Sequence, residues 1–119
     1  MNYKQKIGKY GEDLACEFLQ RKGYSIVDRN VKNSYQEIDV VARIDKELVF
    51  IEVKTRTSDK MGEADEQINN KKLENLKNAI FDYLDMHSLD KIEPRLDLMA
   101  IDINKETKTA RIKHYKDIA

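Results

Sequence analysis

The chain has 119 residues, of which 40% are hydrophobic and 37% are charged, with 22 basic and 22 acidic side chains. This length and composition predict one domain with a single core, over residues 1–119, and exclude a compositionally disordered chain. The formal net charge of +0 excludes nucleic-acid binding by bulk positive charge. Any contact with phosphate must therefore come from a local patch or from a bound metal.

Cysteine usage and hydropathy exclude further classes of protein. Cys16 is the one cysteine, so there is neither a disulfide framework nor a cysteine-based zinc site, and we expect it to be a small packing residue. The sequence contains no run of 18 apolar residues, so no membrane span is predicted. The first residues lack the apolar segment of a signal peptide, so we expect a cytoplasmic protein that does not contact membranes.

The predicted elements follow the order α-β-β-β-α-β-β. In chain order they cover residues 3–22, 24–31, 37–44, 47–54, 65–87, 96–103 and 110–115. The polar segment 55–62 has no period and is expected to be a mobile loop. A crossover through the second helix would set the next strand parallel to a neighbour. The expected fold class is therefore α/β, with a mixed sheet and helices packed on it.

The second and third strands form a predicted β-hairpin, because only Asp45-Lys46 separates them. Pairing across this turn sets Asp39 opposite Glu52, and Glu37 opposite Lys54. Side chains alternate between faces, so these four polar residues should share one face. The expected apolar face carries Ile38, Val40, Ala42, Ile44, Val49, Ile51 and Val53.

The opposed carboxylates of Asp39 and Glu52 are the main functional signal. Their Cβ atoms should lie roughly 5 Å apart and the charges should repel, which a divalent cation would relieve. Glu12 lies at the flank of the first helix's apolar stripe and could reach the sheet. Carboxylate oxygens favour Mg²⁺ or Mn²⁺. Lys54, on the face of Glu52, is placed to orient water or to steady charge on a phosphate.

Basic and polar residues follow this site along the chain. Thr55, Arg56 and Lys60 are predicted to contact a phosphate backbone, which positions nucleic acid without reading its sequence. We therefore expect selection of DNA by structure. Gln67 and Lys71 share a helical face and either touch the site or the DNA, or are solvated surface.

Two roles remain open for Glu37, and the histidines are expected to be structural. Glu37 is interpreted as a cross-strand ion pair of Lys54, or as a second layer that positions Lys54. His87 and His114 have no partner at metal-ligand spacing.

These residues also carry a resemblance to known proteins. Asp39 followed by Glu52-Val53-Lys54 resembles the PD-(D/E)xK nuclease signature. The wider pattern resembles the YraN family, a bacterial group of small uncharacterised proteins related to archaeal Holliday-junction resolvases. The similarity spans about residues 4–103, and the matching stretches are 8–15, 23–24, 29–30, 37–42, 48–56 and 95–100.

The resemblance implies a restriction-endonuclease-like core and metal-dependent hydrolysis of phosphodiester bonds. Glu12, Asp39 and Glu52 match the metal-binding acids, and Lys54 matches the motif lysine. One position departs from the family pattern: Gln36 stands where glycine usually precedes the Glu-Ile-Asp triplet. Glycine permits close approach to the backbone, so this loop should contact substrate differently.

The leading hypothesis is a Mg²⁺- or Mn²⁺-dependent nuclease acting on branched, junction or single-stranded DNA. The alternative is a non-catalytic DNA-binding or partner-recruiting module on a nuclease scaffold. A structural protein without a nucleic-acid partner explains neither the acidic residues nor the basic ones. Cutting both strands of a junction would need two sites, which favours a homodimer.

Overall fold

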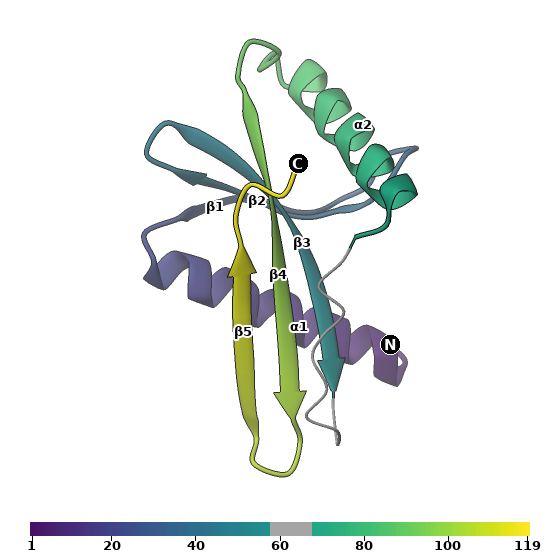
Figure 1. Ribbon diagram of the computed structural model, residues 1–119, viewed down its shortest axis with the longest axis vertical. Coiled ribbons are helices and arrows are strands. Elements are labelled where there is room, and N and C mark those ends of the chain that lie inside the picture. The colour runs from purple at the N-terminus through teal and green to yellow at the C-terminus, as the bar shows by residue number, and fades with distance from the viewer. Residues whose placement is uncertain (58–67) are drawn as a thin grey trace.

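A five-stranded mixed sheet with two helices makes up the described chain (Figure 1). The computed structural model describes residues 1–57 and 68–119. Its elements are α1 (Tyr3–Arg21), β1 (Ser25–Val31), β2 (Ile38–Ile44), β3 (Glu47–Thr57), α2 (Asn70–Met86), β4 (Pro94–Asn104) and β5 (Thr109–Tyr115). The strands lie in chain order, with β3 and β4 parallel and the other pairs antiparallel. The predicted order of elements and the mixed sheet are confirmed.

The sheet separates two apolar cores, each covered by one helix. Val40 and Val49 pack in the core that includes buried residues of α1, whereas Val41 and Phe50 pack in the core that includes α2. Neighbouring residues thus point to opposite faces, as a strand requires. Every residue from Leu48 to Glu52 in β3 is buried, which is the pattern of a central strand covered on both sides.

The predicted hairpin register is confirmed from Ile44↔Glu47 to Val40↔Ile51. The turn is closed by Asp45 at a φ of 51°, a conformation that aspartate tolerates. The ladder between β2 and β3 ends at Val40 and Ile51. The prediction that Ile38 shares a face with Val40 is wrong, because Ile38 packs in the core beneath α2. Strict alternation of faces therefore does not continue beyond the end of the β2–β3 ladder.

Most element boundaries differ from the prediction by one or two residues, and those of β3 and α2 differ by more. Residues 55–57 were expected in a loop, but β3 continues to Thr57, which pairs with Ile103 of β4. Pairing with β4 therefore holds polar residues in a strand. Helix α2 begins at Asn70, and the Asn69 side chain caps it by accepting from the Lys72 amide at 2.8 Å. The predicted helix start at residue 65 lies outside the described residues. Lys60 and Gln67 lie outside the described residues.

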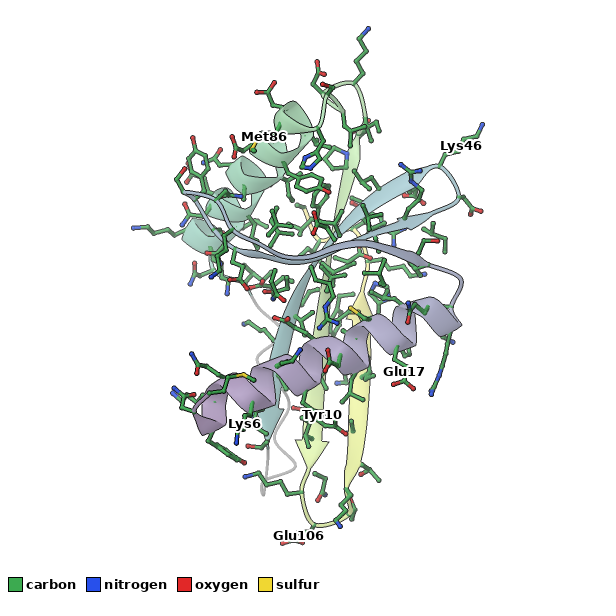
Figure 2. The ribbon with its side chains drawn as sticks, turned by 180° about the vertical axis from the view of Figure 1, so that it is seen from behind. Lys6, Tyr10, Glu17, Lys46, Met86 and Glu106 are labelled. Carbon is green, nitrogen blue, oxygen red and sulfur yellow. The ribbon has the colours of Figure 1, made fainter. Side chains whose placement is uncertain are left out.

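α1 lies across the long strands, as seen from behind in Figure 2, and touches β3 closely at one point. A Cβ atom at Gly11 would overlap the Thr55 side chain, so only glycine fits this contact. Cys16 is buried in the same core, as expected. Neither described helix is long and apolar enough to span a membrane.

A fully buried carboxylate, Asp97 of β4, ties the C-terminal segment to the sheet. It accepts hydrogen bonds from the Arg95 guanidinium at 2.9 and 3.0 Å, and from the Asp117 amide at 2.9 Å. His114 Nε2 lies 2.7 Å from Asp97 Oδ2, so this histidine is structural, as expected. Arg95 also donates to the Tyr24 hydroxyl at 2.8 Å. We call Tyr24, Arg95, Asp97 and His114 the Asp97 network.

Burial alone would raise the pKa of Asp97. The hydrogen bonds from His114, Arg95 and the Asp117 amide outweigh it, so that the pKa lies below its ordinary value. The negative charge is therefore stabilised within the fold.

Candidate metal and nucleic-acid site

The candidate site lies where β2 and β3 part. Asp39 is the first residue of β2 beyond the shared ladder, and its Oδ2 accepts a hydrogen bond from the Val53 amide at 2.8 Å. This bond takes the place of a main-chain ladder bond. The Asp39 carboxylate is thereby held in the gap between the two strands.

Two further carboxylates meet Asp39 there. Ligand oxygens of Glu12, Glu37 and Asp39 all lie within 4.8 Å of one another, and we call these three residues the acidic cluster. They come from α1, from the residue preceding β2 and from β2 itself. Among the described residues, no other group of three acidic, histidine or cysteine side chains converges in this way.

Asn30 of β1 holds the acidic cluster together from one side. Its amide nitrogen donates to Glu12 at 2.7 Å and to Glu37 at 3.2 Å. Asn30 has a φ of 51°, in the left-handed region where asparagine is enriched. Arg29 adds positive charge 3.9 Å from Glu12, although its closer partner is Asp13 at 2.6 Å. The family resemblance includes residues 29–30, but it assigned no role to Asn30, because that role depends on this backbone conformation.

Glu52 adjoins the acidic cluster and is buried, with 3% of its side chain exposed. Burial, then the hydrogen bond and the negative charge of Glu52, raise the pKa of Asp39 well above its usual range, against the opposing effect of the Val53 amide. This raised pKa means that the fold disfavours a negative charge on Asp39. The predicted meeting of these two acids is what the structure shows.

The ammonium group of Lys72 on α2 reaches Glu52 at 2.5 Å. Lys71, predicted either to touch the site or the DNA or to be solvated surface, is exposed on the helix. A sequence signal for Lys72 existed: it stands four residues before Leu76, which is buried, and therefore on the inner side of α2. The buried stripe of α2 therefore determines which of the two neighbouring lysines turns inward.

The remaining predicted residues continue from Glu52 along β3. Lys54 follows two residues later, on the same face by strand alternation. Thr55 and Arg56 line a groove together with Glu12, and the Arg56 Nε atom lies 3.8 Å from Asp102. Glu37 lies outside the β2–β3 ladder, which differs from its expected place directly opposite Lys54. It accepts the hydrogen bond from Asn30 and lies beside the other two acids of the acidic cluster.

The donor set fits a hard divalent cation. Glu12, Glu37 and Asp39 present carboxylate oxygens only, and Glu52 adds another acid beside them. Oxygen ligands of this kind suit Mg²⁺, Mn²⁺ or Ca²⁺ better than softer metals. A cation there would replace the proton that the raised pKa of Asp39 retains.

The mixed sheet, its two helices and the acids gathered between parting strands define an α/β protein with a restriction-endonuclease-like core. The family model described as uncharacterised protein family UPF0102 matches residues 11–101. The chain belongs to this family. UPF0102 is the YraN family, so the family resemblance seen in the motifs is confirmed.

Relatives of similar length support the assignment. The chain is 40% identical over 111 residues to a UPF0102 protein of Flavobacterium psychrophilum, covering 93% of this chain and 91% of that protein. It is 40% identical over 118 residues to a UPF0102 protein of Caldicellulosiruptor bescii, covering 98% of each. The names of these relatives state no activity.

Proposed function

We propose that this protein is a divalent-metal-dependent nuclease that hydrolyses phosphodiester bonds in branched, junction or single-stranded DNA. The observation that carries the proposal is the convergence of Glu12, Asp39 and Glu52 from three elements onto the gap between β2 and β3. A fold built only for stability would avoid burying acids together, because each raises the cost of ionising the other.

The residues of the site have distinct roles in this proposal. Glu12, Asp39 and Glu52 hold Mg²⁺ or Mn²⁺, and Glu37 supports them through its shared partner Asn30. When bound, the metal supplies charge stabilisation at the phosphate and lowers the pKa of water. Lys54 orients the attacking water and steadies the charge that develops on the phosphate oxygens.

DNA contacts come from groups that follow the site. Thr55 and Arg56 of β3, with Lys60 and Lys71, bind the phosphate backbone, which gives selection by shape instead of by sequence. We place the protein in the cytoplasm and infer a homodimer when both strands of a junction are cut.

A cleavage assay with matched acid variants tests the proposal. Asp39→Asn preserves the size of the side chain and its bond to the Val53 amide, yet removes the charge. We expect it to lower the rate of junction or single-strand cleavage in Mn²⁺ by at least about 10²-fold. Glu17→Gln, on the exposed side of α1, should leave the rate unchanged. Equal rates for highly purified wild type and Asp39→Asn would contradict the proposal.

The Lys72–Glu52 ion pair favours a second candidate, a DNA-binding or partner-recruiting module without catalysis. An ammonium group at 2.5 Å already neutralises one acid that a metal would need. Calorimetric titration with Mn²⁺ separates the two candidates. A nuclease binds the metal at the acids, and Asp39→Asn weakens that binding; a module shows neither effect while still binding DNA.

A further inference from the structure

A groove of about 490 Å³ opens next to the acidic cluster, between the N-terminal half of α1 and the end of β3. Figure 1 shows this half of the helix beside the C-terminal end of β3. The residues that line the groove include Tyr3, Lys4, Gly8, Glu12, Thr55 and Arg56. Its volume is within the range of about 300–1,000 Å³ that is typical of small-molecule pockets.

The groove is continuous with the candidate metal site. Glu12 belongs both to the acidic cluster and to the wall of the groove. Val53, whose amide holds the Asp39 carboxylate, also lines it. If a phosphate of a nucleic-acid strand lay at the acids, the neighbouring nucleotide of that strand could therefore reach this groove.

The lining suits a nucleotide. Lys4 and Arg56 supply positive charge, and Thr55 supplies a hydroxyl group. The Tyr3 side chain is 55% exposed, and Lys105 Nζ from the turn after β4 lies 4.2 Å from the centre of its ring. An exposed aromatic ring among cations is the combination that single-stranded nucleic-acid sites use, with a base on the ring and phosphates on the cations.

We propose that this groove binds the nucleotide next to the scissile phosphate in an unpaired DNA strand, with its base on Tyr3 and its phosphate near Lys4 and Arg56. The proposal rests on the proposed nuclease function for the position of the phosphate. Stacking on Tyr3 requires a base with a free face, which a base inside a duplex does not offer. The groove thus accounts for a preference for unpaired strands.

Gly8 gives a way to close the groove without disturbing the fold. A Cβ atom there would have no heavy atom within 4 Å, so larger side chains fit and project into open space. Alanine and leucine are also better helix formers than glycine. Gly8→Ala and Gly8→Leu should both fold, while only leucine fills the groove. Gln20→Leu, exposed near the other end of α1, is the matched control.

Fluorescence anisotropy with a labelled single-stranded oligonucleotide measures the effect, both without added metal and in Ca²⁺. We expect Gly8→Leu to weaken binding roughly tenfold, the scale of one lost base–aromatic stack. Gly8→Ala and Gln20→Leu should bind like the wild type. Tyr3→Leu should weaken binding to a similar extent, whereas Tyr3→Phe, which keeps the aromatic ring, should bind like the wild type. A blunt duplex of the same length should bind all variants alike.

Each result decides the matter. Undiminished single-strand binding by Gly8→Leu, an equal loss for the duplex, or no single-strand binding by the wild type in either condition overturns the groove assignment. A selective loss with Gly8→Leu in a protein that cleaves nothing in Mn²⁺ supports the groove and removes the hydrolysis. If Gly8→Leu cleaves at the full rate and binds single strands unchanged, the hydrolysis is supported and the groove assignment is overturned.

Discussion

Two buried carboxylates, Asp97 and Glu52, lie one register position apart on neighbouring strands but face different environments. Ile51 pairs with Asp97 in the β3–β4 ladder, so Glu52, the next residue along β3, points to the other face. Asp97 is surrounded by donors: Arg95, His114 and the Asp117 amide. Glu52 adjoins another acid, Asp39, with Lys72 as its partner in an ion pair.

The pKa shifts express this difference. The pKa of Asp97 is lowered, because its donors outweigh the effect of burial, whereas burial and Glu52 raise the pKa of Asp39. The fold stabilises negative charge at Asp97 and opposes it at Asp39. Charge without internal compensation is typical of a functional site, since a ligand completes it. The Asp97 network is therefore structural, whereas the acidic cluster between β2 and β3 could hold a metal ion.

The largest expected effect comes from breaking the Asp97 network. Asp97→Asn removes the charge that pairs with Arg95 and His114, and it should lower the free energy of unfolding by about 3–5 kcal/mol. Urea denaturation followed by circular dichroism measures the change. Glu47→Gln, which alters only the exposed partner of Arg95, should cost less than about 1 kcal/mol. Equal losses in the two variants would show that Asp97 is not the centre of the network.

Replacing Asp39 is expected to change the free energy of unfolding in the opposite direction when no metal is present. Its raised pKa means that the folded state holds a proton that the unfolded chain releases, so stability falls as pH rises from about 4 towards the raised value. Asp39→Asn imitates the protonated acid. In EDTA at neutral pH it should raise the free energy of unfolding on the order of 2 kcal/mol and flatten the pH dependence.

Unfolding curves in EDTA at several pH values measure this effect, and repeating them in Mn²⁺ should reverse the order of the two proteins. The metal stabilises only the wild type, by mass action. A destabilised Asp39→Asn protein in EDTA would contradict the inference that the acids repel. Asp97 behaves differently: its stabilising contribution is lost as pH falls through its lowered pKa.

A smaller effect should follow from releasing Glu52. Lys72→Met keeps the length of the side chain and removes the ammonium group that a cation must displace. We expect Mn²⁺ affinity, measured by calorimetry, to rise about tenfold, or 1.4 kcal/mol. Lys71→Met, on the exposed side of the same helical turn, should leave affinity unchanged. Weaker binding in Lys72→Met would instead make the lysine a support of the metal-bound state.

The sequence was sufficient to predict the order of elements and the meeting of Asp39 with Glu52. Both depend on local rules: the two-residue turn at Asp45-Lys46 fixes the hairpin register, and alternation fixes the faces. The same rules failed at Ile38, because β2 leaves its partner there. They also failed at residues 55–57, where pairing with β4 outweighs the polarity of the side chains.

Long-range contacts were beyond such rules. The Asp97 network joins Tyr24, Arg95 and His114 across the chain, so no periodic pattern predicts it. The spacing of Lys72 from the buried Leu76 placed it on the inner side of α2, but its pairing with Glu52 of β3 is a contact between distant parts of the chain that no periodic pattern predicts. The position of Glu37 likewise depends on the conformation of Asn30.

The contact between Gly11 and Thr55 has a consequence for precision at the site. The backbone of α1 at Gly11 lies directly against the Thr55 side chain of β3, so no larger residue fits between the helix and the strand at this point. Glu12 is the next residue, so this contact fixes how far its carboxylate reaches into the gap between β2 and β3. Replacing Leu14 or Phe18, further along the same helix, by alanine should lower the free energy of unfolding while leaving the Glu12 carboxylate in place.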